Sequence, residues 1–529
     1  MHTIHKKTLA VLFAVLLMAT MWTVSVHAEG EKTEPETEKS PFTYEIVEET
    51  VTITGFDKTV EGKLEIPATI EEKPVTVIGD SAFNGCAKLT AIAIPDSVTA
   101  IDAKAFYGCK GLTTITIPAA VAAIGDDAFG ECVKLAAIEV EETNTTYCDV
   151  DGILFSEDMT CLVRYPAKYP VAQYTIPESV TTIGMRAFFG CSSLSGVVIP
   201  ENVTSIGSNA FHFCPGLTEV TIPTSIKTLE YGVFSSCTGL VSVFIPASVE
   251  TIGSHAFSSC SRLVSVAIPN SVTSIGNSAF SGCSSLSQVK IPDSVVSMGD
   301  SVFAFCDGLM AIDIPDNVQK LGSRAFMFCE NLRSATIGSG VTAIAKETFL
   351  GCWKMNKVTM SENVTAIGDA AFHYCPALNG VIIPENVTSI GYDAFAGCAA
   401  LTEIVVPEGV LAIQAGAFRD CKKLAVVTIP LSVVQVKESA FSGCEKLADV
   451  YYAGNKKSKK EMTIGDGNEQ LTAKATWHYQ LEDEVEVPTI VKKKTPPANP
   501  SWKKPLVYAG AFLVTVVFFV FLFRKKPQR

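Results

Sequence analysis

Apolar and polar positions along this chain repeat with a period of 23 residues. Within the unit at 272–291 the apolar positions are Val272, Ile275, Ala279, Phe280, Cys283, Leu286, Val289 and Ile291. Fifteen units carry a phenylalanine followed three residues later by a cysteine. One interval, from Phe129 to Phe188, lasts 59 residues, or two periods plus 13. A fixed period this short predicts a solenoid, in which each coil buries its apolar positions against the neighbouring coils.

Each 23-residue coil is predicted to contain two extended segments and one turn. The segment 286–292 (LSQVKIP) alternates apolar and polar residues and ends at a proline, which cannot donate to a β-ladder, so it predicts a short strand. The segment 272–276 (VTSIG) predicts a second extended piece with a glycine at its bend. The segment 278–283 (SAFSGC) is predicted as a short helical turn that brings its phenylalanine and cysteine to the same inner face.

The fifteen regularly placed cysteines suggest three explanations: packing, disulfides or a metal array. Equivalent positions in neighbouring coils lie about 4.8 Å apart, which is within the Cα separation of about 4.4–6.8 Å that a disulfide tolerates. Parallel side chains, an odd number of thiols and the lack of converging histidines nevertheless favour packing. Cys148 and Cys161 lie outside the 23-residue register, and an exported hairpin that holds both is compatible with a disulfide between them.

The two ends of the chain predict export and membrane anchoring. Residues 1–28 have a basic start, an apolar run and a small-residue end, which is typical of a cleaved signal peptide. Residues 506–523 are 18 apolar residues without a charge, long enough for one transmembrane helix of about 27 Å, and the basic segment 524–529 predicts a cytoplasmic tail. The sequence VPTI at 487–490 lacks a Leu-Pro-x-Thr-Gly sorting motif, which favours a membrane anchor over covalent wall linkage.

The remaining boundaries follow from changes in the repeat. Residues 29–446 are predicted to form the solenoid, which a longer interval near 141–172 interrupts. Residues 447–479 follow the last repeat unit. The charged, proline-bearing segment 480–505 is predicted as a semi-extended stalk above the membrane.

Charge and motif content narrow the classes of function. Eleven of the 42 basic residues lie in the signal, the lysines at 492–504 and the tail, so residues 29–491 hold 31 basic and all 55 acidic residues. An acidic domain repels phosphate backbones, so nucleic acid is not an expected partner. The chain has no nucleophile elbow, phosphate-binding glycine loop or zinc-protease helix motif. His212, His255 and His373 stand at variable positions that are expected to face solvent. We therefore expect neither catalysis nor a cofactor.

The repeat carries a resemblance to a known family. The pattern Val-x-x-Ile-Gly-x-x-Ala-Phe-x-x-Cys-x-x-Leu-x-x-Ile-x-Ile-Pro resembles the BspA-like, or treponemal-type, leucine-rich repeats of bacterial and some protist surfaces. Residues 42–70 resemble the amino-terminal coils of this family, 144–166 its recurrent hairpin and 450–479 its bacterial closing cap. The resemblance therefore implies an N-terminal cap, a hairpin insertion near 141–172 and a C-terminal cap at 447–479. The resemblance implies a leucine-rich-repeat solenoid with short parallel β-strands and short helical turns. It also implies adhesion to host proteins, other microbes or polysaccharides.

Binding is expected at exposed strand positions. The outward column before each proline contains Ala93, Thr116, Glu139, Thr175, Val198, Thr221, Phe244, Ala267, Lys290, Asp313, Thr336, Thr359, Ile382, Val405 and Thr428. The threonines suit a plain β-surface. Phe244 is an exposed aromatic among small residues and is the leading candidate anchor, with Val198, Ile382 and Val405 as further candidates. Two successive coils, at 337–345 and 360–361, depart from the repeat and indicate either a local change of curvature or drift.

The leading hypothesis is a non-enzymatic cell-surface adhesion or recognition protein. It would bind an extracellular protein or polysaccharide of host or microbial origin through the solenoid face. The alternative is a structural cell-envelope protein without a specific ligand. An exo-enzyme would need a clustered acid–base pair, and a signalling receptor would need more than a six-residue tail.

Overall fold

The computed structural model describes residues 40–481. The expected signal peptide, transmembrane helix and cytoplasmic tail lie outside this range, as does nearly all of the expected stalk. Within residues 40–481, no helix is both long enough and apolar enough to cross a membrane.

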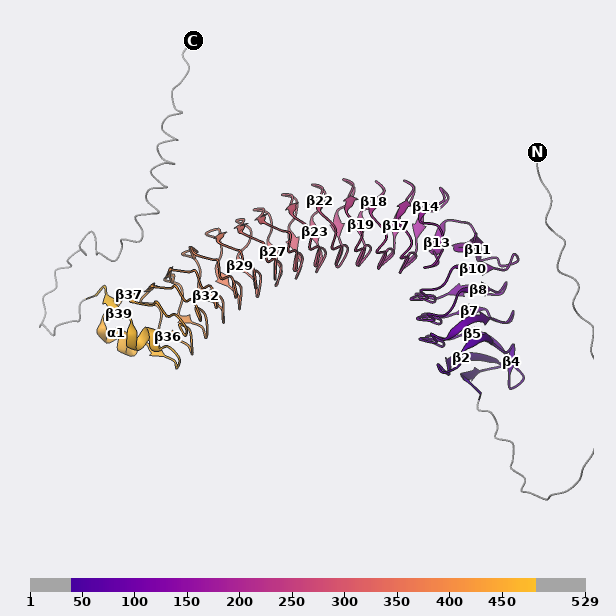
Figure 1. Ribbon diagram of the computed structural model, residues 1–529, viewed down its shortest axis with the longest axis horizontal. Helices are drawn as coiled ribbons and strands as arrows, with labels where there is room; N and C mark the ends of the chain where they lie inside the picture. Colours follow the sequence, from indigo (N-terminus) through magenta and orange to yellow (C-terminus); the bar gives the residue numbers. More distant parts are fainter. Residues whose placement is uncertain (1–39, 482–529) are drawn as a thin grey trace, which may run out of the picture. The chain divides into compact units, whose positions relative to one another are not determined.

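Successive coils of the chain stack side by side, and each coil has three sides (Figure 1). The long-strand face holds the strands that precede the repeat prolines, together with the equivalent strands of coils that lack one: β3(Gly62–Glu65), β6(Leu89–Ala93), β8(Thr114–Ile117), β10(Ala137–Val140), β14(Gln173–Thr175), β16(Gly196–Val198), β18(Glu219–Thr221), β20(Ser242–Phe244), β22(Ser265–Ala267), β24(Gln288–Lys290), β26(Ala311–Ile314), β28(Ser334–Ile337), β30(Lys357–Thr359), β33(Glu403–Val405), β35(Val426–Ile429), β37(Asp449–Tyr452) and β39(Thr476–Tyr479).

The short-strand face holds mostly two-residue strands, most of which are followed by a bend glycine: β5(Lys73–Ile78), β7(Ala100–Ile101), β9(Ala123–Ile124), β15(Thr182–Ile183), β17(Ser205–Ile206), β19(Thr228–Leu229), β21(Thr251–Ile252), β23(Ser274–Ile275), β25(Ser297–Met298), β27(Lys320–Leu321), β29(Ala343–Ile344), β31(Ala366–Ile367), β32(Ser389–Ile390), β34(Ala412–Ile413), β36(Gln435–Val436) and β38(Thr463–Ile464). The paired residues are 23 positions apart in the regular coils, as in Ser274 and Ser297. The sequence period therefore sets the register of the parallel sheets.

The third side, which we call the turn face, runs from three residues before each repeat phenylalanine to four residues after it. Its backbone bonds link neighbouring coils: the Phe280 N–H donates to the Val302 carbonyl at 2.9 Å. Residues two before and two after the phenylalanine have positive φ, as in Ser278 (53°) and Gly282 (76°). The expected short helical turn is wrong in this respect, because two left-handed residues per coil break the helical path into consecutive tight turns.

Stacked phenylalanines form the centre of the core. Neighbouring rings from Phe83 to Phe129 and from Phe188 to Phe441 have centroids 4.7–5.9 Å apart, and the ladder residues are almost completely buried. Tyr165 continues this ladder in the long interval, because its ring stacks on Phe188 at 4.9 Å. The interval thus holds one irregular coil, to which Tyr165 belongs. Two periods of 23 residues and 13 additional residues separate Phe129 from Phe188.

Those additional residues belong to a small antiparallel insertion. It contains β11(Tyr147–Val150), β12(Ile153–Ser156) and β13(Cys161–Arg164), in the order β11-β12-β13. The last of these strands joins the short-strand face by pairing with β15. At the other side of the insertion, the Tyr147 hydroxyl accepts a hydrogen bond from the Ile124 N–H at 3.0 Å. This bond satisfies a backbone donor on β9, the last strand of its sheet.

Each end of the described chain carries non-repeating structure. At the start, β1(Phe42–Val47) and β2(Thr50–Phe56) form an antiparallel pair, and β4(Thr69–Ile70) pairs with β5. At the end, α1(Lys456–Glu461) and the π-helix η1(Gln470–Lys474) separate β37, β38 and β39. Asn455 caps α1 by accepting a bond from the Ser458 N–H. These elements cover the first and last coils.

Candidate functional site

The long-strand face presents its strongest apolar feature around Phe244. This side chain ends β20, lies opposite Thr221 of the preceding coil and is 59% exposed. Val241, in the same coil, and Val264, at the equivalent position of the next coil, are also exposed. Phe244 is therefore one of three exposed apolar residues in two neighbouring coils, which we call the Phe244 cluster. The two valines were missed by the sequence analysis, although their place directly after the repeat leucine marks them as outward-facing.

The other predicted binding residues do not all join this cluster. Val198 is exposed at the end of β16 and lies in the column of Phe244, with Thr221 between them. Ile382 and Val405 lie in neighbouring coils, but Ile382 is six coils from Phe244, or about 29 Å at the strand spacing. The structure thus brings Val198 near Phe244 and places the other two residues in a separate region.

The long-strand face is interrupted at Ile382, which is 81% exposed. Its coil contributes only an isolated bridge between Lys357 and Gly380, and residues 381–384 form no strand. The two coils with irregular sequence at 337–361, by contrast, retain paired strands on both faces. The interruption begins at Gly380, where the expected strand would start, although Gly196 begins β16 at the equivalent position.

A second structural feature separates the coil of Phe129 from that of Tyr165. Both sheets end there: β9 and β10 close one set of strands, and β13 and β14 belong to the next. The buried apolar residues likewise divide into two clusters, 51–154 and 153–471. We call this boundary the junction.

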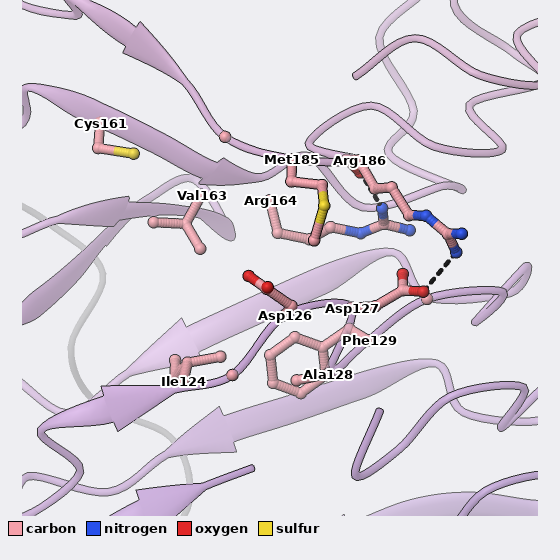
Figure 2. Close-up of a pocket in the computed structure, with 13 residues that line it drawn as sticks. Ile124, Asp126, Asp127, Ala128, Phe129, Cys161, Val163, Arg164, Met185 and Arg186 are labelled. Atoms are coloured by element: carbon pink, nitrogen blue, oxygen red, sulfur yellow. Dashed lines mark hydrogen bonds and ion pairs between the residues drawn. The ribbon is translucent and has the colours of Figure 1, made fainter. Parts of the chain in front are cut away.

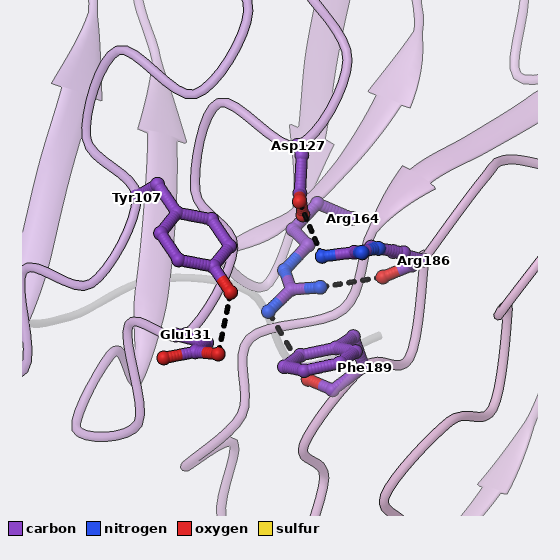
Figure 3. Close-up of polar contacts among 6 residues, drawn as sticks. All are labelled: Tyr107, Asp127, Glu131, Arg164, Arg186 and Phe189. Carbon is purple, nitrogen blue, oxygen red and sulfur yellow. Dashed lines mark hydrogen bonds and ion pairs between the residues drawn. The ribbon is translucent and has the colours of Figure 1, made fainter. Parts of the chain in front are cut away.

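Charged side chains bridge the junction. Arg186 pairs with Asp127, 59 residues earlier, and its guanidinium lies 5.2 Å from the centre of the Phe189 ring. Arg164 is almost completely buried and donates hydrogen bonds to the carbonyls of Arg186 and Phe189. Figure 3 shows both arginines converging beside Asp127. These contacts replace the regular sheet bonds that the insertion interrupts.

Burial controls the electrostatics of this group. Burial raises the pKa of Asp127, and the guanidinium groups of Arg186 and Arg164 oppose that shift. The Tyr107 hydroxyl donates a hydrogen bond to Glu131. Burial and this hydrogen bond raise the pKa of Tyr107 to about 12. The side-chain atoms Oδ1 of Asp127 and Nε of Arg164 are buried without a protein partner.

A cavity of about 160 Å³ lies at the junction. Figure 2 shows Ile124 and Asp126 on one of its walls and Val163 and Met185 on the other. This volume holds only a few water molecules. The junction is therefore better suited to joining the two sets of coils than to binding a substrate.

The repeat cysteines serve as packing residues that also donate hydrogen bonds. The Cys283 thiol is completely buried and donates to the Phe257 carbonyl of the preceding coil at 3.2 Å. Burial raises its pKa to about 12, so the sulfur keeps the proton it donates. The same bond recurs along most of the ladder, as in Cys109 with the Phe83 carbonyl at 3.3 Å. This role accounts for the fixed spacing between cysteine and phenylalanine.

Cys148 and Cys161 are both free thiols in the structure. They lie on β11 and β13, which are separated by β12, so the disulfide considered from the sequence is not formed. The Cys148 thiol instead donates to the Ser156 carbonyl at 3.2 Å.

The histidines differ from the solvent-facing positions that the sequence suggested. His212 is half buried and its ring stacks on Phe189 at 5.3 Å. His373 is also half buried, against Tyr374. Burial lowers the pKa of both rings. Within residues 40–481, no group of three or more histidine, cysteine or acidic side chains is arranged to hold a metal ion.

The comparisons with known proteins agree with the repeat structure. Four segments match the family described as BspA type leucine rich repeat region, in six copies: 61–150, 167–287, 251–379 and 365–465. The chain belongs to this family.

Solved structures of bacterial leucine-rich repeat proteins are similar to the chain. A leucine-rich repeat protein from Bacteroides ovatus shares 28% identity over 84% of this chain and 99% of its own, with a TM-score of 0.49. A leucine rich cell surface protein from Faecalibacterium prausnitzii shares 27% identity over 80% of this chain and 96% of its own, with a TM-score of 0.38. A search of the curated proteins found no significant match.

Proposed function

We propose that this protein is a non-enzymatic recognition protein of the cell surface that binds an extracellular macromolecule through its long-strand face. The observation that carries the proposal is the exposure of Phe244, Val241 and Val264 in two neighbouring coils of a face whose outward residues are mostly small or polar. Exposed aromatic and aliphatic side chains that lie together are typical anchors of a binding interface.

The shape of the surface supports a large ligand. The strands present outward-facing side chains in successive coils, and three cavities of the described chain have volumes of about 160, 320 and 240 Å³. Extended repeat surfaces of this kind suit proteins or polysaccharides better than small molecules. The family consists of surface repeat proteins, which is consistent with recognition and with the absence of an enzymatic role.

The proposed location is the outer surface of the cell membrane. Export by the segment 1–28 and anchoring by the apolar segment 506–523 would leave the repeats outside. Protease treatment of intact cells tests this topology. Cleavage of the repeats without lysis supports it, and protection of the repeats contradicts it.

Binding of the full-length protein to immobilised extracellular proteins and polysaccharides tests the function. Saturable binding that Phe244→Ala weakens at least tenfold supports recognition through this cluster. Lys290→Ala, in the same outward column two coils away, is the matched control and should bind as the unaltered protein does. Binding that survives Phe244→Ala would reject the site. No binding to any member of the panel would favour a structural envelope protein.

A further inference from the structure

The turn face contains a position whose conformation favours glycine. The residue two places after each ladder phenylalanine has a positive φ, between 53° and 78°, in all fifteen regular coils. Seven coils place glycine there, at 85, 108, 190, 282, 351, 397 and 443. Four others place an aromatic residue there: Phe213, Phe305, Phe328 and Tyr374. Bulky side chains are disfavoured in this left-handed conformation.

Core packing does not compensate for this conformation. Phe213, Phe305 and Tyr374 are 52%, 45% and 59% exposed. The Phe328 ring is half buried because it lies against the glycine of the next coil: a Cβ at Gly351 would be 2.3 Å from its Cδ1 atom. These rings therefore lean along the surface, where one side contacts the following coil and the other side remains accessible.

Three of these rings lie within four successive coils. Phe305 and Phe328 occupy neighbouring coils with centroids 5.5 Å apart. The next coil has Gly351 at this position but presents Trp353, which is 53% exposed, two residues later. The following coil presents Tyr374. We call Phe305, Phe328, Trp353 and Tyr374 the aromatic row. The row spans four coils, and because neighbouring paired strands lie about 4.8 Å apart, it extends over about 14 Å.

The charge around the aromatic row is nearly balanced. Residues 303–376 contain seven acidic and six basic side chains, whereas the domain as a whole is strongly acidic. Several of these charges are already paired within the protein: Arg324 and Lys346 both contact Glu347, and the Lys354 ammonium donates to the Asn331 amide oxygen at 2.6 Å. The row therefore favours a neutral ligand over an anionic or cationic one.

We propose that the aromatic row binds an extended, neutral polysaccharide. The apolar face of a sugar ring stacks on an aromatic ring, and a linear chain of sugars can place successive rings along a single row of aromatic residues. This surface is separate from the cluster around Phe244 on the long-strand face. The inference thus adds a second binding surface and a ligand class to the proposed recognition function.

The arrangement of the row favours a polysaccharide over a protein. Stable protein interfaces bury about 800 Å² on each partner around a central cluster of anchors, whereas this row is one residue wide. An extended peptide would gain affinity by pairing with free backbone groups. At the row, the Phe305 and Phe328 N–H groups already donate to the Met327 and Leu350 carbonyls of the next coils, at 2.8 and 2.7 Å.

The test replaces ring side chains by the residue that other coils carry. The triple variant Phe305→Gly, Phe328→Gly and Tyr374→Gly introduces glycine where seven coils already have it, so the fold should be retained. Phe213→Gly is the matched control, because it removes an exposed ring from the same coil position outside the row. The probes are neutral β-glucan, xylan and mannan oligosaccharides, with alginate as an anionic comparison. Titration calorimetry of the full-length protein measures affinity, and a change in tryptophan fluorescence that is absent in Trp353→Phe reports contact with the row.

We expect saturable binding of at least one neutral oligosaccharide, at least tenfold weaker in the triple variant and within twofold of the unaltered protein for Phe213→Gly. Thermal unfolding of both variants should show retained structure. Absence of neutral binding, binding to alginate alone, or equal losses in both variants would overturn the proposal. The proposal would also be overturned if the triple variant lost binding of a protein ligand while the unaltered protein bound no sugar. Phe244→Ala tests the long-strand face independently, so failure of either surface can be recognised separately.

Discussion

Replacing Phe280 with alanine tests whether each coil depends mainly on its immediate neighbours. Phe280 is completely buried, and its ring lies 5.3 Å from those of Phe257 and Phe303, with interplanar angles of 9° and 6°. Removing a buried phenylalanine side chain costs about 3–5 kcal/mol, which includes the cavity that remains. In a solenoid, this loss should affect the altered coil and the coils that touch it.

Hydrogen exchange followed by mass spectrometry measures that distribution. Since about 1.4 kcal/mol corresponds to a factor of ten, amide protection should fall by roughly 100- to 4,000-fold in the coils from Phe257 to Phe303. Protection around Phe418, six coils away, should remain unchanged. Phe244→Ala makes the same chemical change at a phenylalanine that is 59% exposed, so it should alter protection by less than about threefold.

Two results would refute this reasoning. An equal loss of protection along residues 40–481 would show that the coils unfold together. Similar effects of Phe280→Ala and Phe244→Ala would show that burial in the ladder does not determine the stability of a coil.

Three further predictions concern thiols, histidine and the junction. Iodoacetamide at neutral pH should modify the half-buried Cys148 and Cys161 before any repeat cysteine, as peptide mass spectrometry can show; early labelling of the ladder would contradict its burial. Burial and, to a lesser extent, the charge of Arg186 lower the pKa of His212 in the folded protein. The contribution of His212 to stability should therefore be constant above about pH 6.5 and fall as the pH drops below that value. Melting temperatures at pH 7.5 and 5.5 should therefore differ less in His212→Gln, and an equal difference would exclude this residue. A double-mutant cycle of Asp127→Asn and Arg186→Gln should give a coupling of about 1–3 kcal/mol, and a value near zero would show that the pair does not join the coils.

The repeat made much of the core predictable. In a stack of 23-residue coils, residue i lies beside residue i+23, so the period identifies both the buried positions and their partners. The packing role of the cysteines followed from the same regularity. Their hydrogen bonds to phenylalanine carbonyls did not, because those bonds depend on how the turn orients its backbone.

The candidate binding residues were predictable only in part. The alternation of strand residues identified Phe244, Val198 and Val405 as outward-facing, and all three are exposed. Nothing in the repeat separated Ile382 from the sheet, since its coil keeps the repeat spacing and Gly196 starts a strand at the position equivalent to Gly380. The loss of the strand depends on whether backbone groups of neighbouring coils meet, which a single coil does not specify.

The sequence by itself determined the coil, its buried face and the register of its strands, because every regular unit repeats the same local pattern. Tertiary structure decided what happens where the repeat fails. The 13 additional residues place Arg186 beside Asp127, 59 positions earlier, and join two sets of coils by charged contacts. Tertiary structure also decided that the turn face contains residues with positive φ, some of which carry aromatic side chains at the surface. Both outcomes depend on contacts between coils, whose geometry is fixed only when the chain is stacked.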